Sequence, residues 1–172
     1  MFLIIRPLRL ALKALLVEST PFQMSLGLAL GVLIGLVPKG NLLAILLGVV
    51  LAASRANLGI AAATIFLVSL ISSFLDPMTH AIGVWLLSLP ALQSFWTTLY
   101  NMPLMLWTDF YNSVVLGSFV MGLMLIYPAH RLTQPLFEKH SEKVAAWARR
   151  FWLTRALLGV EWADRIGSAT GG

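Results

Sequence analysis

Polar side chains recur at helical spacing in one stretch of an otherwise apolar region. They are Ser69, Ser72, Ser73, Asp76 and His80. On a continuous α-helix these positions share one face, since they follow each other at steps of three, one, three and four residues. Hydroxyl, carboxylate and imidazole groups on that face cannot point into lipid without losing their hydrogen bonds. This polar stripe therefore predicts a groove within the membrane that handles a headgroup or an ion.

A structural interpretation of the same residues stays open. Asp76 would cap a new helix that starts at Pro77, because carboxylates accept hydrogen bonds from the first free N–H groups of a helix. The serine hydroxyls would bond back to carbonyls of their own helix, and His80 would pack in the interior. In this interpretation the stripe stabilises the fold and handles no ligand.

Lys39 interrupts the apolar region at Pro38-Lys39-Gly40-Asn41. An ammonium group within hydrocarbon must snorkel, pair with another group or line water. If the surrounding hairpin crosses the membrane, Lys39 is a solvated residue at its tip; if the hairpin is re-entrant, Lys39 lies at depth and Asp76 is its expected partner. Arg55 and Asn57, at the next polar break, complete the candidate groove residues.

Reaction chemistry is not apparent in this chain. It contains no cysteine, and His80, His130 and His140 lack the spacing of zinc ligands. Asp76 and His80 could share a metal at i, i+4, but two ligands do not make a site. Neither a nucleophile elbow nor a phosphate-binding loop is present in the sequence. We therefore expect no enzymatic activity, no metal and no cofactor.

Composition points to an integral membrane protein. Of the 172 residues, 59% are hydrophobic and 11% are charged, and the mean hydropathy is +0.86. A small water-soluble core could not bury so much apolar surface. The formal charge of +5 occurs without the high overall charge of nucleic-acid binders. We therefore expect anionic phospholipids as partners and no nucleic acid.

Basic residues gather at the two ends of the chain. Ten of the 12 Lys and Arg residues lie in positions 1–20 or after position 130. Such flanks remain in the cytoplasm, so both termini are predicted to be cytoplasmic and the number of crossings to be even. Each end also resembles an amphipathic helix lying on the membrane surface, and the C-terminal one could instead dock a partner. The membrane-surface residues are Arg6, Arg9, Lys13, Trp147, Arg149, Arg150, Trp152 and Arg155.

Hydrophobic segments between these flanks come in three pairs. The pairs are 22–37 with 42–53, 58–75 with 78–89, and 92–107 with 111–127, and Asp76-Pro77 is one of the breaks. A 12-residue helix rises about 18 Å, whereas the hydrocarbon core is about 30 Å thick. The arms are therefore either tilted helices across a thin membrane or re-entrant hairpins. The predicted fold class is all-α, with an interfacial helix at 1–20, a membrane domain of about three hairpins at 21–128, and a cytoplasmic basic helix and tail at 129–172.

Glycines recur at every fourth position of the first arm. Gly27, Gly31 and Gly35 share one helix face, where the missing Cβ atoms allow another helix to approach closely. That helix could be the second arm of the same hairpin or belong to another subunit. Thr20, Pro21 and Gln23 predict the start of this arm, with Thr20 as N-cap and Gln23 completing a capping box.

Aromatic residues cluster between 95 and 111. Trp96, Tyr100, Trp107 and Tyr111 have rings with one polar edge, which favour the headgroup level of a membrane. We interpret them as interfacial anchors.

One extended motif resembles a known family. T-P-x5-G-x-A-x-G-x2-I-G-L-x-P runs from Thr20 to Pro38, followed by R-x-N at Arg55 and the D-P pair at Asp76. The pattern is similar to a family of small bacterial inner-membrane proteins recorded as a domain of unknown function. Lys39 stands where that family is expected to have glycine, and Asp76 where it has asparagine. The resemblance implies a bacterial envelope protein, with some relatives encoded beside a second envelope gene, and it supplies no catalytic residues.

Two functional hypotheses follow. The first is a non-enzymatic subunit of the bacterial inner membrane that docks a larger envelope protein, in lipid transport or envelope maintenance. The alternative is a self-sufficient small transporter or lipid scramblase, whose path would be lined by Lys39, Ser72, Ser73, Asp76 and His80. The expected partners are phospholipids and either a larger envelope protein or further copies of the chain.

Overall fold

The computed structural model describes residues 20–140, and this part of the chain is helical without any strand. The all-α prediction is therefore confirmed. The predicted surface helices at the two ends lie outside the described residues. Their candidate residues are Arg6, Arg9, Lys13, Trp147, Arg149, Arg150, Trp152 and Arg155.

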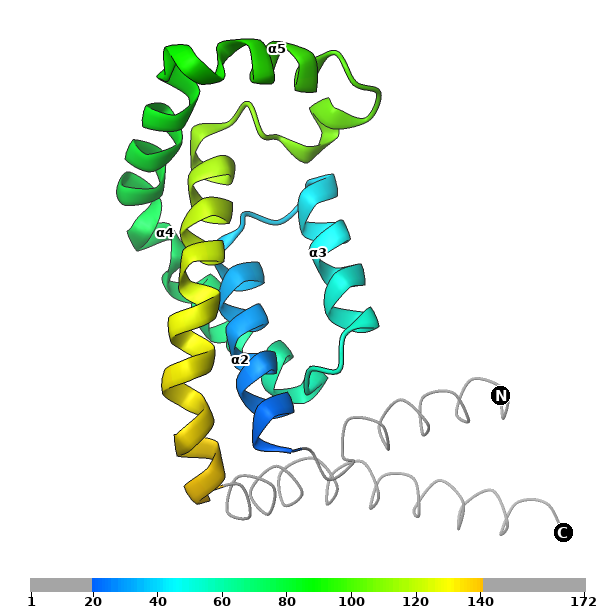
Figure 1. Ribbon diagram of the computed structural model, residues 1–172, viewed down its shortest axis with the longest axis vertical. Coiled ribbons are helices and arrows are strands. Elements are labelled where there is room, and N and C mark those ends of the chain that lie inside the picture. Colours follow the sequence, from blue (N-terminus) through cyan, green and yellow to red (C-terminus); the bar gives the residue numbers. More distant parts are fainter. Residues whose placement is uncertain (1–19, 141–172) are drawn as a thin grey trace, which may run out of the picture.

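Helices α2 (Pro21–Leu36) and α3 (Leu42–Ala53) form a hairpin (Figure 1). The capping box predicted for α2 is confirmed, because the Gln23 N–H donates to Thr20 Oγ1 at 3.3 Å and the Thr20 N–H donates to Gln23 Oε1 at 2.9 Å. The hairpin turns at 38–41, where proline cannot continue a helix and Gly40 has a φ of 101°. Asn41 then caps α3 by accepting a 2.9 Å hydrogen bond from the Ala44 N–H.

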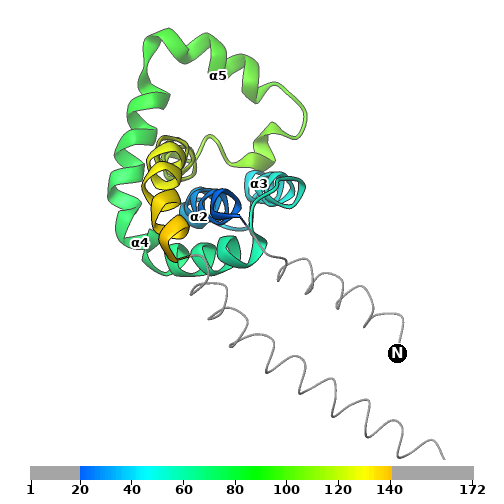
Figure 2. The same cartoon turned by 60° about the horizontal axis from the view of Figure 1, so that its bottom comes forward.

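Helix α4 (Leu58–Ser88) is continuous through Pro77, so the predicted break at Asp76-Pro77 is wrong. A proline removes one backbone hydrogen bond, and a long helix retains all the others. Prolines are also tolerated in apolar helices where neighbouring elements hold the chain on both sides. The helix bends instead of ending, and it curves around α2 (Figure 2).

In the predicted third pair, the first arm is wrong, whereas the second, 111–127, lies almost entirely within the Ser113–His140 helix. In place of one helix over 92–107 the chain forms η1 (Pro90–Leu92), α5 (Gln93–Tyr100) and η2 (Met105–Thr108). Pro103 explains the interruption, since the residue before a proline avoids helical geometry. The returning helix, Ser113–His140, passes position 128 without interruption, so no backbone break marks the predicted boundary there.

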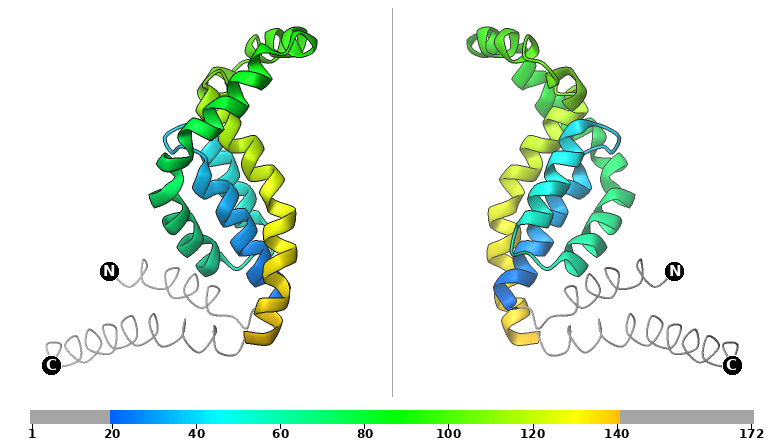
Figure 3. Two further views of the ribbon diagram at one scale, coloured as in Figure 1. Left: turned by 90° about the vertical axis from the view of Figure 1, so that its left-hand side faces the viewer. Right: turned by 90° about the vertical axis from the view of Figure 1, so that its right-hand side faces the viewer.

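The helices alternate in direction along a common axis. Helices α2 and α4 run the same way, whereas α3 and the Ser113–His140 helix run back, and α5 lies across the end where α4 finishes (Figure 3). Two apolar clusters lie between them. One buried cluster is Ile34, Leu51, Ala56 and Ala61, and a second is Val37, Leu43 and Val115.

Two of the described helices have the length and composition to cross a membrane. They are α4, with a mean hydropathy of 2.2 over its best 18 residues, and Ser113–His140, with 1.6. At 1.5 Å per residue they are about 46 Å and about 42 Å long. Only 6% of that window in α4 is buried, against 33% in Ser113–His140, so most of the apolar surface of α4 faces outward.

Candidate functional site

The glycine face of α2 packs against α4. A Cβ atom at Gly27 would lie 2.5 Å from the Asn57 carbonyl oxygen, one at Gly31 2.7 Å from Thr64 Cβ, and one at Gly35 2.6 Å from Val68 Cβ. These separations are too short for real Cβ atoms, so the close approach requires glycine at all three positions. The partner is in the same chain, but it is α4 and not the second arm of the hairpin.

A backbone hydrogen bond fixes the start of this interface. The Asn57 N–H donates to the Gln23 carbonyl at 2.9 Å, and Asn57 Oδ1 accepts from the Ile60 N–H at 2.8 Å to cap α4. The first turn of α4 is thereby held beside the first turn of α2. Both ends of the α2–α3 hairpin consequently lie at one end of the molecule, and the tip at 38–41 lies toward the other (Figure 1).

A second close approach joins α4 to the Ser113–His140 helix and was not predicted. Cβ atoms added at Gly83 or Gly117 would overlap the carbonyl oxygens of Ser113 and Thr79, respectively. Gly122 similarly faces Leu33 of α2. Gly117 and Gly122, with Ser118 beside them, are small residues in an apolar helix, and this is the sequence signal by which the interface could have been found.

The polar stripe of α4 contributes to these helix contacts. Ser69 Oγ donates to the Gly35 carbonyl of α2 at 3.2 Å, and His80 Nδ1 lies 2.6 Å from Ser113 Oγ on the returning helix. Ser72 Oγ bonds back to the Ser69 carbonyl at 3.0 Å, as the structural interpretation expects. Ser73 is exposed and Asp76 is half-buried.

Lys39 does not pair with Asp76, which corrects the expected ion pair. Its ammonium group donates to the carbonyls of Ile34 at 2.7 Å, Gly35 at 3.1 Å and Val37 at 2.6 Å. The last carbonyls of a helix lack intrahelical partners, and a cation satisfies them well. Lys39 therefore caps the end of α2. Arg55 is exposed at the opposite end of the hairpin.

His130 forms the remaining polar contact between helices. Its Nδ1 lies 2.8 Å from the hydroxyl of the buried Ser25, and its ring meets Phe22 edge to face at 5.0 Å. Within residues 20–140, every buried side-chain nitrogen or oxygen has a hydrogen-bond partner. In the same range, no three His, Cys, Asp or Glu residues come close enough to hold a metal ion.

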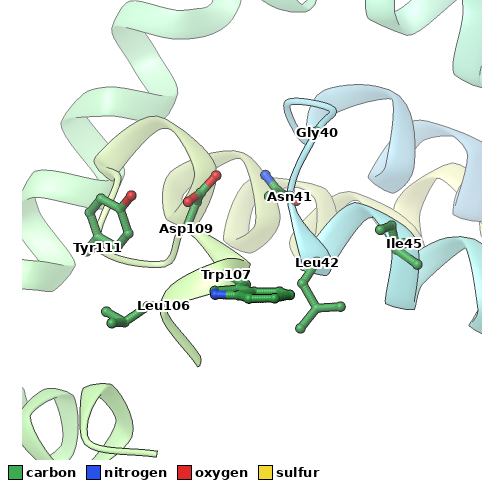
Figure 4. Close-up of a pocket in the computed structure, with 8 residues that line it drawn as sticks. All are labelled: Gly40, Asn41, Leu42, Ile45, Leu106, Trp107, Asp109 and Tyr111. Carbon is green, nitrogen blue, oxygen red and sulfur yellow. The ribbon is translucent and has the colours of Figure 1, made fainter. Parts of the chain in front are cut away.

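An open groove of about 780 Å³ lies between the hairpin tip and the segment that follows α5. It is lined by Gly40, Asn41, Leu42, Ile45, Leu106, Trp107, Asp109 and Tyr111. The Asp109 carboxylate extends toward the hairpin tip, and the Trp107 ring lies next to Leu42 (Figure 4). Trp107 and Tyr111 are the residues expected at the membrane interface, whereas nothing in the sequence predicts that Asp109 lines a groove with the hairpin tip.

The η2 segment, which supplies Leu106 and Trp107 to this hairpin-tip groove, is flanked by two residues with an unusual backbone. Leu104 and Asp109, which flank η2, have φ values of 68° and 58°. Left-handed geometry is uncommon for residues other than glycine, and strongly so for leucine. Asp109 also forms a hydrogen bond with Tyr111, and this bond and the negative charge raise the pKa of the Tyr111 phenol.

Comparison with known sequences identifies the family. The family described as an uncharacterized protein conserved in bacteria (DUF2062) matches residues 6–146. The chain belongs to this family. The predicted resemblance to a bacterial family of unknown function is therefore confirmed. An uncharacterized protein of Treponema pallidum (strain Nichols) is 28% identical over 130 residues, which cover 76% of this chain and 80% of that protein. No solved structure matches.

Proposed function

We propose that this chain is a non-enzymatic subunit of the bacterial inner membrane that docks a larger envelope protein, in lipid transport or envelope maintenance. The observation that carries the membrane placement is the outer face of α4. Phe66, Leu70 and Phe74 are all more than half exposed there, and Phe74 reaches 84%. An apolar surface of this extent is stable against lipid or a partner and not against water.

The proposed arrangement has two crossings. Helix α4 and the Ser113–His140 helix span the bilayer, and the α2–α3 hairpin enters from the cytoplasmic side with both of its ends there. Helix α5 lies along the periplasmic surface. Trp96 Nε1 donates to the Leu86 carbonyl at 3.2 Å and the Tyr100 hydroxyl donates to the Phe110 carbonyl at 3.3 Å, so these two rings hold α5 to the rest of the chain and are not the anchors expected from the sequence. Two crossings agree with cytoplasmic termini, which the distribution of Lys and Arg favours.

A subunit role is supported by how the polar residues are used. Of the residues expected to line a transport path, Lys39, Ser72 and His80 each form a hydrogen bond within the chain. A path for ions or headgroups needs polar groups that remain free to exchange partners. We therefore favour the subunit over a self-sufficient transporter or scramblase.

Topology is testable because the chain has no cysteine. Ser94→Cys in α5 and Arg55→Cys before α4 both change exposed residues. A membrane-impermeant maleimide should label Ser94→Cys in intact spheroplasts and Arg55→Cys only after lysis. Labelling of Arg55→Cys in intact spheroplasts, or of neither variant after lysis, would contradict the two-crossing arrangement.

Docking is tested by photo-crosslinking in living cells. A photoreactive residue at Phe74 on α4 should form one defined adduct with a larger envelope protein. The same residue at Met124, which is exposed on the other spanning helix, is the matched control and should not form that adduct. Adducts with lipid alone at both positions would reject the subunit role. Phospholipid flux by the purified chain in liposomes would then establish the alternative.

A further inference from the structure

The hairpin-tip groove combines a carboxylate, aromatic rings and an apolar wall. Asp109 is half-buried there, beside Trp107, which is 69% exposed, and Tyr111, which is 57% exposed. No cation within residues 20–140 pairs with this carboxylate, whose side chain has Tyr111 as its partner. Carboxylates bind ammonium groups through charge-assisted hydrogen bonds, and an indole face adds a cation–π contact. The polar end of the groove is therefore complementary to a primary ammonium group.

The apolar end of the groove continues along α3. Ile45 lines the groove and is 64% exposed, and Val49 lies one turn further along the same face and is 59% exposed. Between them Gly48 leaves open space, since a Cβ atom there would meet nothing within 4 Å. The surface from Ile45 to Val49 thus forms an apolar track that starts at the groove. An acyl chain fits this track, whereas a soluble amine would leave it uncovered.

We propose that the hairpin-tip groove binds a phospholipid with a primary-amine headgroup, such as phosphatidylethanolamine. Its ammonium contacts Asp109 and Trp107, and one of its acyl chains lies along the Ile45–Val49 track of α3. The inference rests on the membrane placement proposed above, and it does not depend on the docking of a larger protein. It adds a lipid class and a position to the expected phospholipid partner.

The test uses the full chain in nanodiscs with photoreactive lipids. Phosphatidylethanolamine that carries a diazirine in its acyl chain is compared with phosphatidylglycerol that carries the same group, and labelled peptides are mapped by mass spectrometry. The amine lipid should label α3 about three- to tenfold more than the anionic lipid, as expected for a partly exposed charge contact. Both lipids should label the exposed face of α4 equally, and this labelling is the reference for bulk lipid.

Two variants locate the headgroup and the acyl chain separately. Asp109→Asn removes the charge and keeps the side-chain size, and asparagine tolerates the left-handed backbone at this position. It should abolish the preference for the amine lipid at α3, whereas Asp76→Asn, which changes a carboxylate outside the groove, should retain it. Gly48→Leu places a side chain in the open track and should reduce α3 labelling by the amine lipid several-fold.

Three kinds of result would contradict the proposal, and each points to a different error. Equal labelling of α3 by both lipids, or a preference unchanged in Asp109→Asn, would overturn the amine-lipid site. Loss of the preference on addition of millimolar free ethanolamine would overturn it in favour of a soluble amine. Absence of labelling at α4 as well as α3 would show that the chain is not embedded in the bilayer, and it would reject the membrane placement together with the site.

Discussion

The backbone N–H of Asn57 donates a 2.9 Å hydrogen bond to the carbonyl of Gln23, which joins the first turn of α4 to the first turn of α2. Gly27 lies at this crossing, one turn beyond Gln23. The bond and the glycine together set how closely the two parallel helices can approach. Changes at this crossing should therefore affect the whole helix packing.

Gly27→Ala should destabilise the fold. Its Cβ atom would lie 2.5 Å from the backbone oxygen of Asn57, and a backbone atom cannot rotate away. Overpacking of this kind costs about 1–3 kcal/mol. Gly48→Ala is the matched control, because open space surrounds Gly48 and alanine favours helix over glycine by up to about 1 kcal/mol. Denaturant titration in detergent measures both changes, and equal stabilities of the two variants would contradict the packing.

Gly122 and Leu33 should be energetically coupled. A Cβ atom at Gly122 would meet Leu33 Cδ1 at 2.5 Å and Leu33 Cα at 3.0 Å. Leu33→Ala alone creates a cavity, at a cost of about 2–5 kcal/mol. In the double variant Gly122→Ala/Leu33→Ala, the methyl group of the new alanine at position 122 occupies part of the space that the leucine leaves. The two changes should therefore cost less together than the sum of the single changes, and additivity within error would contradict this contact.

Lys39→Met should destabilise the hairpin tip without involving Asp76. The substitution leaves three carbonyls at the end of α2 without their ammonium donor, and we expect a loss of about 1–3 kcal/mol. A double-mutant cycle with Asp76→Asn should show no coupling, because the two side chains do not pair. A coupling energy above about 0.5 kcal/mol would restore the ion pair expected from the sequence.

Ser25→Ala should weaken the contact between α2 and the Ser113–His140 helix. The buried hydroxyl lies 2.8 Å from His130 Nδ1, and its removal leaves the imidazole without this partner, at a cost of about 1–2 kcal/mol. Ser73→Ala is the control, since Ser73 is exposed on α4. Thermal unfolding followed by circular dichroism compares the two, and a larger effect at Ser73 would contradict the assignment.

Local signals in the sequence were sufficient for the α2–α3 hairpin. The capping box at Thr20 and the proline at 38 bound α2, and the predicted arm 42–53 coincides with α3. The ends of both helices are set by local residues, through side-chain caps and a proline. Such positions can be recognised without knowledge of the partner helix.

The errors arose where distant contacts override local preference. Pro77 predicts a break, but packing on both sides of it holds α4 in one helix. The spacing of the glycines predicts a close helix partner, but it does not indicate whether Gly31 packs against α4 or α3. The hairpin-tip groove depends on η2 folding back to a tip more than 60 residues earlier in the chain, and neither segment predicts the other.

Helix α3 has few buried residues, since Leu43 and Leu51 account for them, yet the topology depends on it. Parallel neighbours cannot be joined by a tight turn, so the chain must return to its starting end between α2 and α4. Helix α3 makes this return and thereby determines the end of the molecule at which α4 starts. Without α3, α4 would start from the opposite end, and α5 and the Ser113–His140 helix would exchange ends with it.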